Sequence, residues 1–126
     1  MKFVTLEKDS VKTTAHYSPA VVHENIIYVS GQLPLKKGEQ VPSSDNIEDQ
    51  TMIVLEKMKT ILEASNSSID KVLRTTIYIS DINYWDRVNA VYAKFFGDHR
   101  PARTIVPTKT LHYCCLIELD AIAFQE

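Results

Sequence analysis

Cysteine is scarce in this sequence, and its placement excludes two kinds of site. The chain of 126 residues has only two cysteines, and they are adjacent, Cys114 and Cys115. One vicinal pair cannot provide a framework of structural disulfides. No histidine stands at a metal-ligand spacing beside the pair, so we expect no metal site there. The simplest expectation is that both cysteines are small buried residues.

Long apolar runs and an excess of positive charge are also missing. No run approaches the roughly 20 residues of a membrane-spanning helix, and the N-terminus lacks the charged and then apolar pattern of a secretory signal. The net charge is −2 and the isoelectric point is about 6.1, which argues against a general nucleic-acid-binding surface. The sequence therefore predicts a cytoplasmic protein with no membrane and no nucleic-acid partner.

The familiar motifs of phosphate and serine chemistry are absent as well. The sequence has no G-x-x-x-x-G-K, G-x-G-x-x-G or G-x-S-x-G segment, and these are the best signals of nucleotide binding and serine-hydrolase chemistry. The four histidines have no mutual spacing that forms a metal site, and we expect His16, His23, His99 and His112 on the surface. His16 and His112 stand beside aromatic residues and could reach the rim of a pocket. We expect no metal and no cofactor.

What is present fits one soluble globular domain over residues 1–126. Hydrophobic residues make up 44% of the chain and charged residues 24%, as in an ordinary globular protein. Alternating and β-branched segments predict strands near residues 4–6, 21–22, 26–29, 73–80, 103–106 and 116–124. Because Asn25 tolerates a left-handed backbone, the second and third of these segments should form a hairpin.

Two segments have the apolar spacing of helices. The first should begin at a capping box made by Asp45 and Glu48 and end near Ser65. The second should be capped by Asn83 and stop at Gly97. Their buried stripes are expected to be Val54, Leu55, Met58, Ile61 and Leu62 in the first helix and Trp85, Val88, Val91, Tyr92 and Phe95 in the second.

This order of elements predicts an α+β fold with a mixed sheet. Two helices cannot cover both faces of such a sheet, so they should pack together on one face. The opposite face still carries apolar residues and needs cover. Another copy of the same chain is the simplest cover, so we expect an oligomer.

Arg103 is the residue at which we expect the chemistry. Pro101 prevents a preceding helix from continuing, and a β-branched run follows, so Arg103 should open a strand. A guanidinium binds a carboxylate through two parallel hydrogen bonds and keeps its charge at any working pH. The alternative is a surface arginine paired with a nearby acid, and residue type alone favours that alternative.

Glu118 and Asp120 form a pair of carboxylates on the last predicted strand. Because they are two residues apart, they should lie on the same face. Side chains on one strand point in parallel rather than across a substrate, so a glycosidase site is a poor interpretation. One of them could line a pocket while the other pairs with a basic residue.

Several segments together resemble the Rid family, also called the YjgF family, of reactive-intermediate deaminases. They occur in family order and span nearly the whole chain. The matching segments are HYSPAV (16–21), YVSGQLP (28–34), TTIYI (75–79), VNAVYAKFF (88–96), PAR (101–103) and IELDAIA (117–123).

The resemblance implies a chorismate-mutase-like fold, a homotrimer with clefts between subunits, and hydrolysis of enamines and imines such as 2-aminoacrylate or 2-iminobutanoate to 2-keto acids and ammonia without a cofactor. It also implies that Arg103 binds the substrate carboxylate. Glu118 would then orient the attacking water or pass a proton. Tyr17 would supply an aromatic wall and a hydroxyl. Further residues that line or support the cleft are Ser30, Gly31 and Asn89.

Three departures from the family pattern fall near the expected cleft and leave the preferred substrate open. Ile105 stands where a cysteine is frequent, Ala15 and His16 replace a Gly-Pro pair, and His112 replaces the proline of a Leu-Pro pair. Two other functions remain open. One is a regulatory trimer that binds small carboxylates without turnover. The other, RNA cleavage linked to translation inhibition, is disfavoured by the acidic balance.

Overall fold

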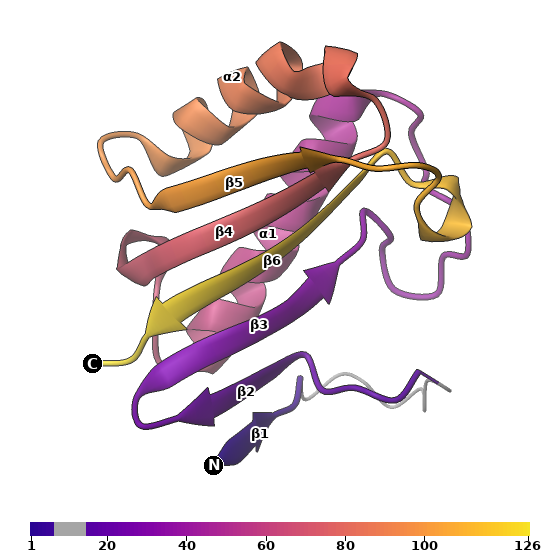
Figure 1. The fold of residues 1–126 in the computed structure, drawn as a ribbon. Coiled ribbons are helices and arrows are strands. Elements are labelled where there is room, and N and C mark those ends of the chain that lie inside the picture. The colour runs from indigo at the N-terminus through magenta and orange to yellow at the C-terminus, as the bar shows by residue number, and fades with distance from the viewer. Residues whose placement is uncertain (7–14) are drawn as a thin grey trace.

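The computed structural model of the chain describes residues 1–6 and 15–126. It consists of a six-stranded mixed sheet with two helices on one face. The strands lie in the order β1-β2-β3-β6-β4-β5, and α1 and α2 pack against each other on the same side of the sheet (Figure 1). Their bounds are β1 Lys2–Val4, β2 Ala20–His23, β3 Ile26–Gln32, α1 Ile47–Ala64, β4 Val72–Ile79, α2 Trp85–Phe96, β5 Ala102–Pro107 and β6 Ile117–Phe124. The predicted α+β architecture is confirmed.

Alternation along β6 separates the core from the outer face of the sheet. Its helix-facing side chains are buried, whereas Glu118, Asp120 and Ile122 are half-buried on the opposite side. We call this opposite side the open face. The same alternation in β4 buries Thr75, Ile77 and Ile79 against the helices. The predicted sharing of a face by Glu118 and Asp120 is therefore correct.

The predicted hairpin is present between β2 and β3. Glu24 and Asn25 occupy its turn with φ of 51° and 63°, the left-handed pair that a two-residue hairpin turn requires. The first edge strand is displaced from the prediction, because β1 ends at Val4 rather than covering residues 4–6.

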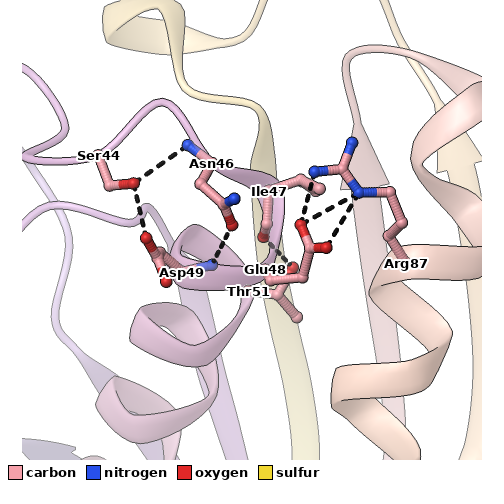
Figure 2. A network of polar contacts seen from close by, with 7 residues as sticks. All are labelled: Ser44, Asn46, Ile47, Glu48, Asp49, Thr51 and Arg87. Atoms are coloured by element: carbon pink, nitrogen blue, oxygen red, sulfur yellow. Dashed lines mark hydrogen bonds and ion pairs between the residues drawn. The ribbon is translucent and has the colours of Figure 1, made fainter.

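The N-terminus of α1 differs from the predicted capping box. Asn46, not Asp45, is the cap, and its side-chain oxygen accepts a hydrogen bond of 3.0 Å from the Asp49 backbone N–H. With Asn46 as the cap, Glu48 is the second residue of the helix and Asp49 the third, so the predicted box of Asp45 and Glu48 is out of register. Glu48 instead accepts from Arg87 of α2 through both of its carboxylate oxygens, at 2.7 to 3.1 Å (Figure 2).

The start of α2 also differs from the prediction. Asp81, not Asn83, caps the turn, because its carboxylate accepts from the Asn83 backbone N–H at 2.9 Å and a short 3₁₀ turn, Ile82–Tyr84, follows. α2 therefore begins at Trp85. The predicted stop at Gly97 is correct, with φ of 64°.

The buried stripe of α2 is narrower than predicted. The fully buried side chains are Val88, Tyr92 and Phe96, whereas Trp85, Val91 and Phe95 are half-buried. The residues predicted as the stripe of α1 are all buried.

α2 connects two parallel strands, β4 and β5, and so forms the crossover of a β-α-β unit at the edge of the sheet (Figure 1). The register of this pair places Arg103 beside Thr75. Across the described residues, neither helix combines the length and apolarity that crossing a membrane would require.

Candidate functional site

The Arg103 side chain lies on the helix-facing side of β5, against α2. Its Nη1 donates a 2.9 Å hydrogen bond to the side-chain oxygen of Asn89. Its guanidinium carbon lies 4.8 Å from the centre of the Tyr92 ring and 5.3 Å from that of the Trp85 ring, within the range of cation–π attraction. A neutral amide and two aromatic rings therefore hold the guanidinium.

No acid pairs with Arg103 among residues 1–6 and 15–126, in which the ion pairs are His23–Glu24, Lys71–Glu126 and Arg87–Glu48. The alternative of a surface arginine paired with a nearby acid thus has no support in the described part of the chain. A half-buried cation without a counter-ion attracts an anionic ligand. A cavity of about 460 Å³ adjoins Arg103, and Asn89, Tyr92, His99 and Arg100 are among its lining residues.

Glu118 projects from β6 onto the open face, next to Gly31 of β3. A β-carbon built on Gly31 would overlap a carboxylate oxygen of Glu118. Position 31 therefore accepts only glycine while Glu118 keeps this orientation. Burial raises the pKa of Glu118 above its ordinary value of 4.5, and the negative charge of Asp120 adds to the rise, while His112 opposes it.

Four of the predicted site residues share one cavity on this side. It has about 630 Å³ and is lined by Tyr17, Ser30, Gly31 and Glu118, with His112 and Tyr113 at its wall. Ser30 Oγ donates a 2.6 Å hydrogen bond to the Ser18 carbonyl, which ties β3 to the segment that carries Tyr17. The Tyr17 side chain is exposed.

Asp120 is the second polar group of β6 on the open face. The hydroxyl of Tyr78 donates to its carboxylate at 3.4 Å. Burial raises the pKa of Asp120, although hydrogen bonds from Tyr78 and Thr76 oppose the rise. Asp120 does not line the cavity that contains Glu118.

The six predicted site residues fall into two groups that a single chain does not bring together. Arg103 and Asn89 lie on the helix side, and Tyr17, Ser30, Gly31 and Glu118 surround a cavity on the open side. Glu118 pairs with Tyr78, which pairs with Val106, three residues beyond Arg103. Two strand spacings and three residues along the strand separate the Cα atoms of Arg103 and Glu118 by roughly 14 Å.

Only one of the two vicinal cysteines is buried as predicted. Cys115 is buried, and burial raises the pKa of its thiol. Cys114 is exposed, because it follows Tyr113 in a turn in which both residues have positive φ, and this turn carries its side chain outward. No group of three or more histidine, cysteine or acidic side chains within the described residues is placed to hold a metal ion.

Three of the four histidines are exposed as predicted, and His99 is the exception. Its ring nitrogen lies 2.8 Å from the Val72 carbonyl, in a half-buried position. His112 lines the cavity with Glu118, and His16 lines a neighbouring one with Tyr17 and Ser30.

The contacts of Trp85 and Tyr92 with Arg103 were not predicted. Helical spacing placed both residues in a core stripe, and that spacing does not distinguish an aromatic that packs on aliphatic side chains from one that also faces a cation. The available signal was the i, i+4, i+7 relation of Trp85, Asn89 and Tyr92, which puts all three on one face of α2.

Comparison with known proteins gives consistent matches over the whole chain. Residues 7–125 match the family model described as endoribonuclease L-PSP. A RutC family protein of Pyrococcus horikoshii is 40% identical over 128 aligned positions, which cover 100% of both chains.

Solved structures match at the level of the fold as well. The Rid-family protein YyfA of Yersinia pestis has a TM-score of 0.87 and 33% identity, over 96% of this chain and 97% of its own. TdcF of Escherichia coli, whose structure contains bound serine, has a TM-score of 0.88 and 27% identity over 100% of both chains.

Proposed function

Since the chain belongs to the Rid family, also known as YjgF, RutC or endoribonuclease L-PSP, we propose that it hydrolyses reactive imines and enamines of small carboxylates to 2-keto acids and ammonia without a cofactor. The observation that carries this proposal is the state of Arg103. Its cation is held by Asn89, Trp85 and Tyr92 and has no acidic partner among the described residues, so its charge is available to a ligand carboxylate. Serine, which is bound in the TdcF structure, is a ligand of this chemical class.

Because Arg103 and Glu118 of one chain are far apart, the proposed function requires a site that is shared between the chains of a homotrimer. One small substrate cannot touch both residues of one chain, because they lie on opposite faces and roughly 14 Å apart. A second copy packed against the α2–β5 edge would bring its own Glu118, Gly31 and Tyr17 to the first copy's Arg103. In a cyclic trimer each protomer gives one half of a site to each neighbour.

The reaction needs a fixed imine carbon and a placed water. Arg103 would hold the carboxylate and leave the adjacent C=N carbon exposed. Water adds to that carbon and one of its protons passes to the nitrogen, which gives a carbinolamine. The remaining hydroxyl proton then passes to the nitrogen as the C–N bond breaks, which leaves a C=O group and ammonia. An enamine first takes a proton at its terminal carbon and gives up one from its nitrogen to become the imine.

Glu118 would accept the proton of the attacking water and return it to the nitrogen. Its raised pKa suits this double role, because an acid–base group works best when its pKa approaches the working pH. Gly31 lets the backbone come close to the reacting centre because it has no β-carbon. Tyr17 and Ser30 would close the wall of the cavity around the substrate side chain.

Two other functions share parts of this site. A trimer that binds small carboxylates without turnover would use Arg103 but would not need Glu118. RNA cleavage is indicated by the name of the matching family model. The net charge of −2 lacks the excess of positive charge that contact with many phosphates favours.

The direct test supplies imines made in situ from several amino acids by an amino-acid oxidase and measures keto acid and ammonia release. We expect faster release with the protein present, unchanged after dialysis against a chelator. Binding of the keto acid without faster release of products would favour the alternative function, a trimer that binds small carboxylates without turnover. A single-stranded RNA incubated with the same preparation distinguishes the third function, and we expect it to remain intact.

The assembly is tested separately by light scattering on a sizing column. Three chains of 14.4 kDa give about 43 kDa. A stable monomer at micromolar concentration would exclude a site shared between chains.

A further inference from the structure

We propose that Trp85 and Tyr92 are positioning residues that hold the Arg103 guanidinium in the orientation in which it receives a ligand carboxylate, an inference that rests on the function proposed above. Neither aromatic residue needs to touch the ligand. Their effect would be exerted through Arg103.

The three side chains that contact the Arg103 guanidinium come from one face of α2. Trp85, Asn89 and Tyr92 are spaced i, i+4 and i+7, so they follow one another along the helix axis. The two ring centres lie 5.3 and 4.8 Å from the guanidinium carbon. Asn89 stands between the rings in sequence and accepts the Nη1 proton at 2.9 Å. The guanidinium thus has aromatic contacts from two residues and an in-plane hydrogen bond from a third.

Tyr92 is itself fixed from the sheet. Its hydroxyl is 2.7 Å from the hydroxyl of Thr75, and both side chains are buried. Thr75 is the β4 residue that pairs with Arg103 on β5. Thr75 therefore anchors the tyrosine ring from the strand position beside Arg103, so the ring cannot move away without breaking a buried hydrogen bond.

This arrangement reduces what ligand binding must order. A free arginine side chain has many rotamers, and holding it still costs conformational entropy. Here the rings and Asn89 hold it before a ligand arrives. Asn89 accepts a hydrogen bond from Nη1, and the other N–H groups of the guanidinium remain to donate to the carboxylate. Trp85 is the better residue to test because it is half-buried, whereas removing the buried Tyr92 ring would also leave a cavity in the core.

The tryptophan also provides a direct optical signal. Trp85 is the only tryptophan in the chain, so the indole fluorescence of the protein reports this position alone. We expect titration with 2-oxobutanoate, a product of the proposed reaction, to change the emission of the wild-type protein with saturation. The Arg103→Ala variant should show no such change. The same saturable change in the Arg103→Ala variant would overturn the proposal, because the ligand would then act on Trp85 without Arg103.

Three substitutions separate positioning from simple stability. Trp85→Leu should weaken 2-oxobutanoate binding and raise KM by about two- to thirty-fold, the range of a cation–π contact, with a smaller effect on kcat. Trp85→Phe should recover most of the loss because it restores an aromatic face. Thr75→Val, which removes only the hydroxyl bonded to Tyr92, should raise KM in the same direction.

Tyr84→Leu is the matched control. Tyr84 makes the same kind of contact with Arg87, at 5.8 Å, one residue before Trp85. We expect the KM of the Tyr84→Leu variant to match that of the wild type. An equal rise in both variants would mean that any aromatic lost near this helix end weakens binding, and the proposal would fail.

A double-mutant cycle keeps this result distinct from the proposed function. Adding Trp85→Leu to Arg103→Ala should change binding no further, because the positioned group is already gone. If Arg103→Ala itself binds 2-oxobutanoate like the wild type, the proposed function fails. If Arg103→Ala loses binding but Trp85→Leu does not, only the positioning role fails.

Discussion

Gly31 and Glu118 lie so close together that no side chain fits at position 31, because a β-carbon there would occupy the place of the Glu118 carboxylate. Gly31→Ala should therefore displace the far end of Glu118 and leave the backbone in place. We expect turnover to fall by about 10²-fold or more, the lower range for loss of a placed acid–base group, with a melting temperature close to the wild type. In a Glu118→Ala background the same substitution should cost less turnover, because only the close approach of the position-31 backbone to the reacting centre is then left to lose. A variant with normal turnover would show that Glu118 does not act from this position.

Arg103→Ala should remove the proposed contact with the substrate carboxylate. Losing one partner of a desolvated charge pair costs about 2–5 kcal/mol, which corresponds to roughly thirty-fold to several-thousand-fold in affinity or rate. Arg103→Lys should also be impaired, because an ammonium keeps the charge without the planar fork. Keto-acid release is the measurement, and Lys94→Ala is the control, since it removes an exposed cation from the last turn of α2. Loss of the oligomer in Arg103→Ala would point to a structural arginine instead.

Mixing two inactive variants tests whether the site is shared. Arg103→Ala and Glu118→Gln should each be inactive as homotrimers. When equal amounts are unfolded together and refolded, a site made of two halves from different chains would be intact in about one quarter of the clefts. We expect about that fraction of wild-type turnover. No recovery in mixed trimers, whose formation is checked by mass spectrometry with a tag on one variant, would contradict a shared site.

Asp120→Asn should move the acid limb of the pH–rate profile to lower pH. The negative charge of Asp120 helps to raise the pKa of Glu118. Removing it favours the ionised form, so Glu118 would work as a base at lower pH. For wild type we expect the limb above the ordinary Glu118 value of 4.5. A limb that does not move would mean that another group controls it.

The same substitution has a second, independent effect on stability. Because the pKa of Asp120 is raised on folding, the folded state binds its proton more tightly. That contribution favours folding at low pH and is lost as the pH rises through the ordinary value of 3.8 to the raised value. Asp120→Asn should therefore raise the melting temperature at pH 7 and leave it unchanged near pH 3, where both forms are neutral.

Asn46→Ala should destabilise the protein by about 1 kcal/mol, the usual cost of losing a helix N-cap. Asp45→Ala, at the residue that the sequence pattern favoured, should change little. Chemical denaturation of the two variants is a direct comparison. Equal losses would mean that the cap is shared between the two positions.

The sequence was enough to predict the order of the main elements and to single out the residues that the structure gathers into two groups. The strand and helix periods are strong in this chain, and the segments that resemble the Rid family contain Arg103, Asn89, Gly31 and Glu118. The helix caps could not be predicted, because adjacent Asp45 and Asn46 are both good caps. In the structure Asn46 is the cap, and Glu48 binds Arg87, which is 39 residues away.

The division of the site between two faces was also hidden from the sequence. It depends on the register of β4 with β5 and of β4 with β6, which sets Arg103 beside Thr75 and Glu118 beside Tyr78. Register follows from packing of the whole sheet. The aromatic contacts of Arg103 were missed for a similar reason, because a pattern of buried residues does not say what a ring faces.

Among the described residues, the side chains that hold the Arg103 guanidinium, Trp85, Asn89 and Tyr92, all lie in the β4–α2–β5 unit, a single uninterrupted stretch within residues 72–107, whereas Tyr17, Gly31 and Glu118 lie outside it. Under the proposed function, anion recognition is therefore inherited as one block of sequence, separate from the residues around the reacting carbon. An exchange of this block between relatives would transfer the anion-binding half intact. Substitutions in the other half could then alter the chemistry or the accepted side chain while leaving the anchoring of the carboxylate untouched.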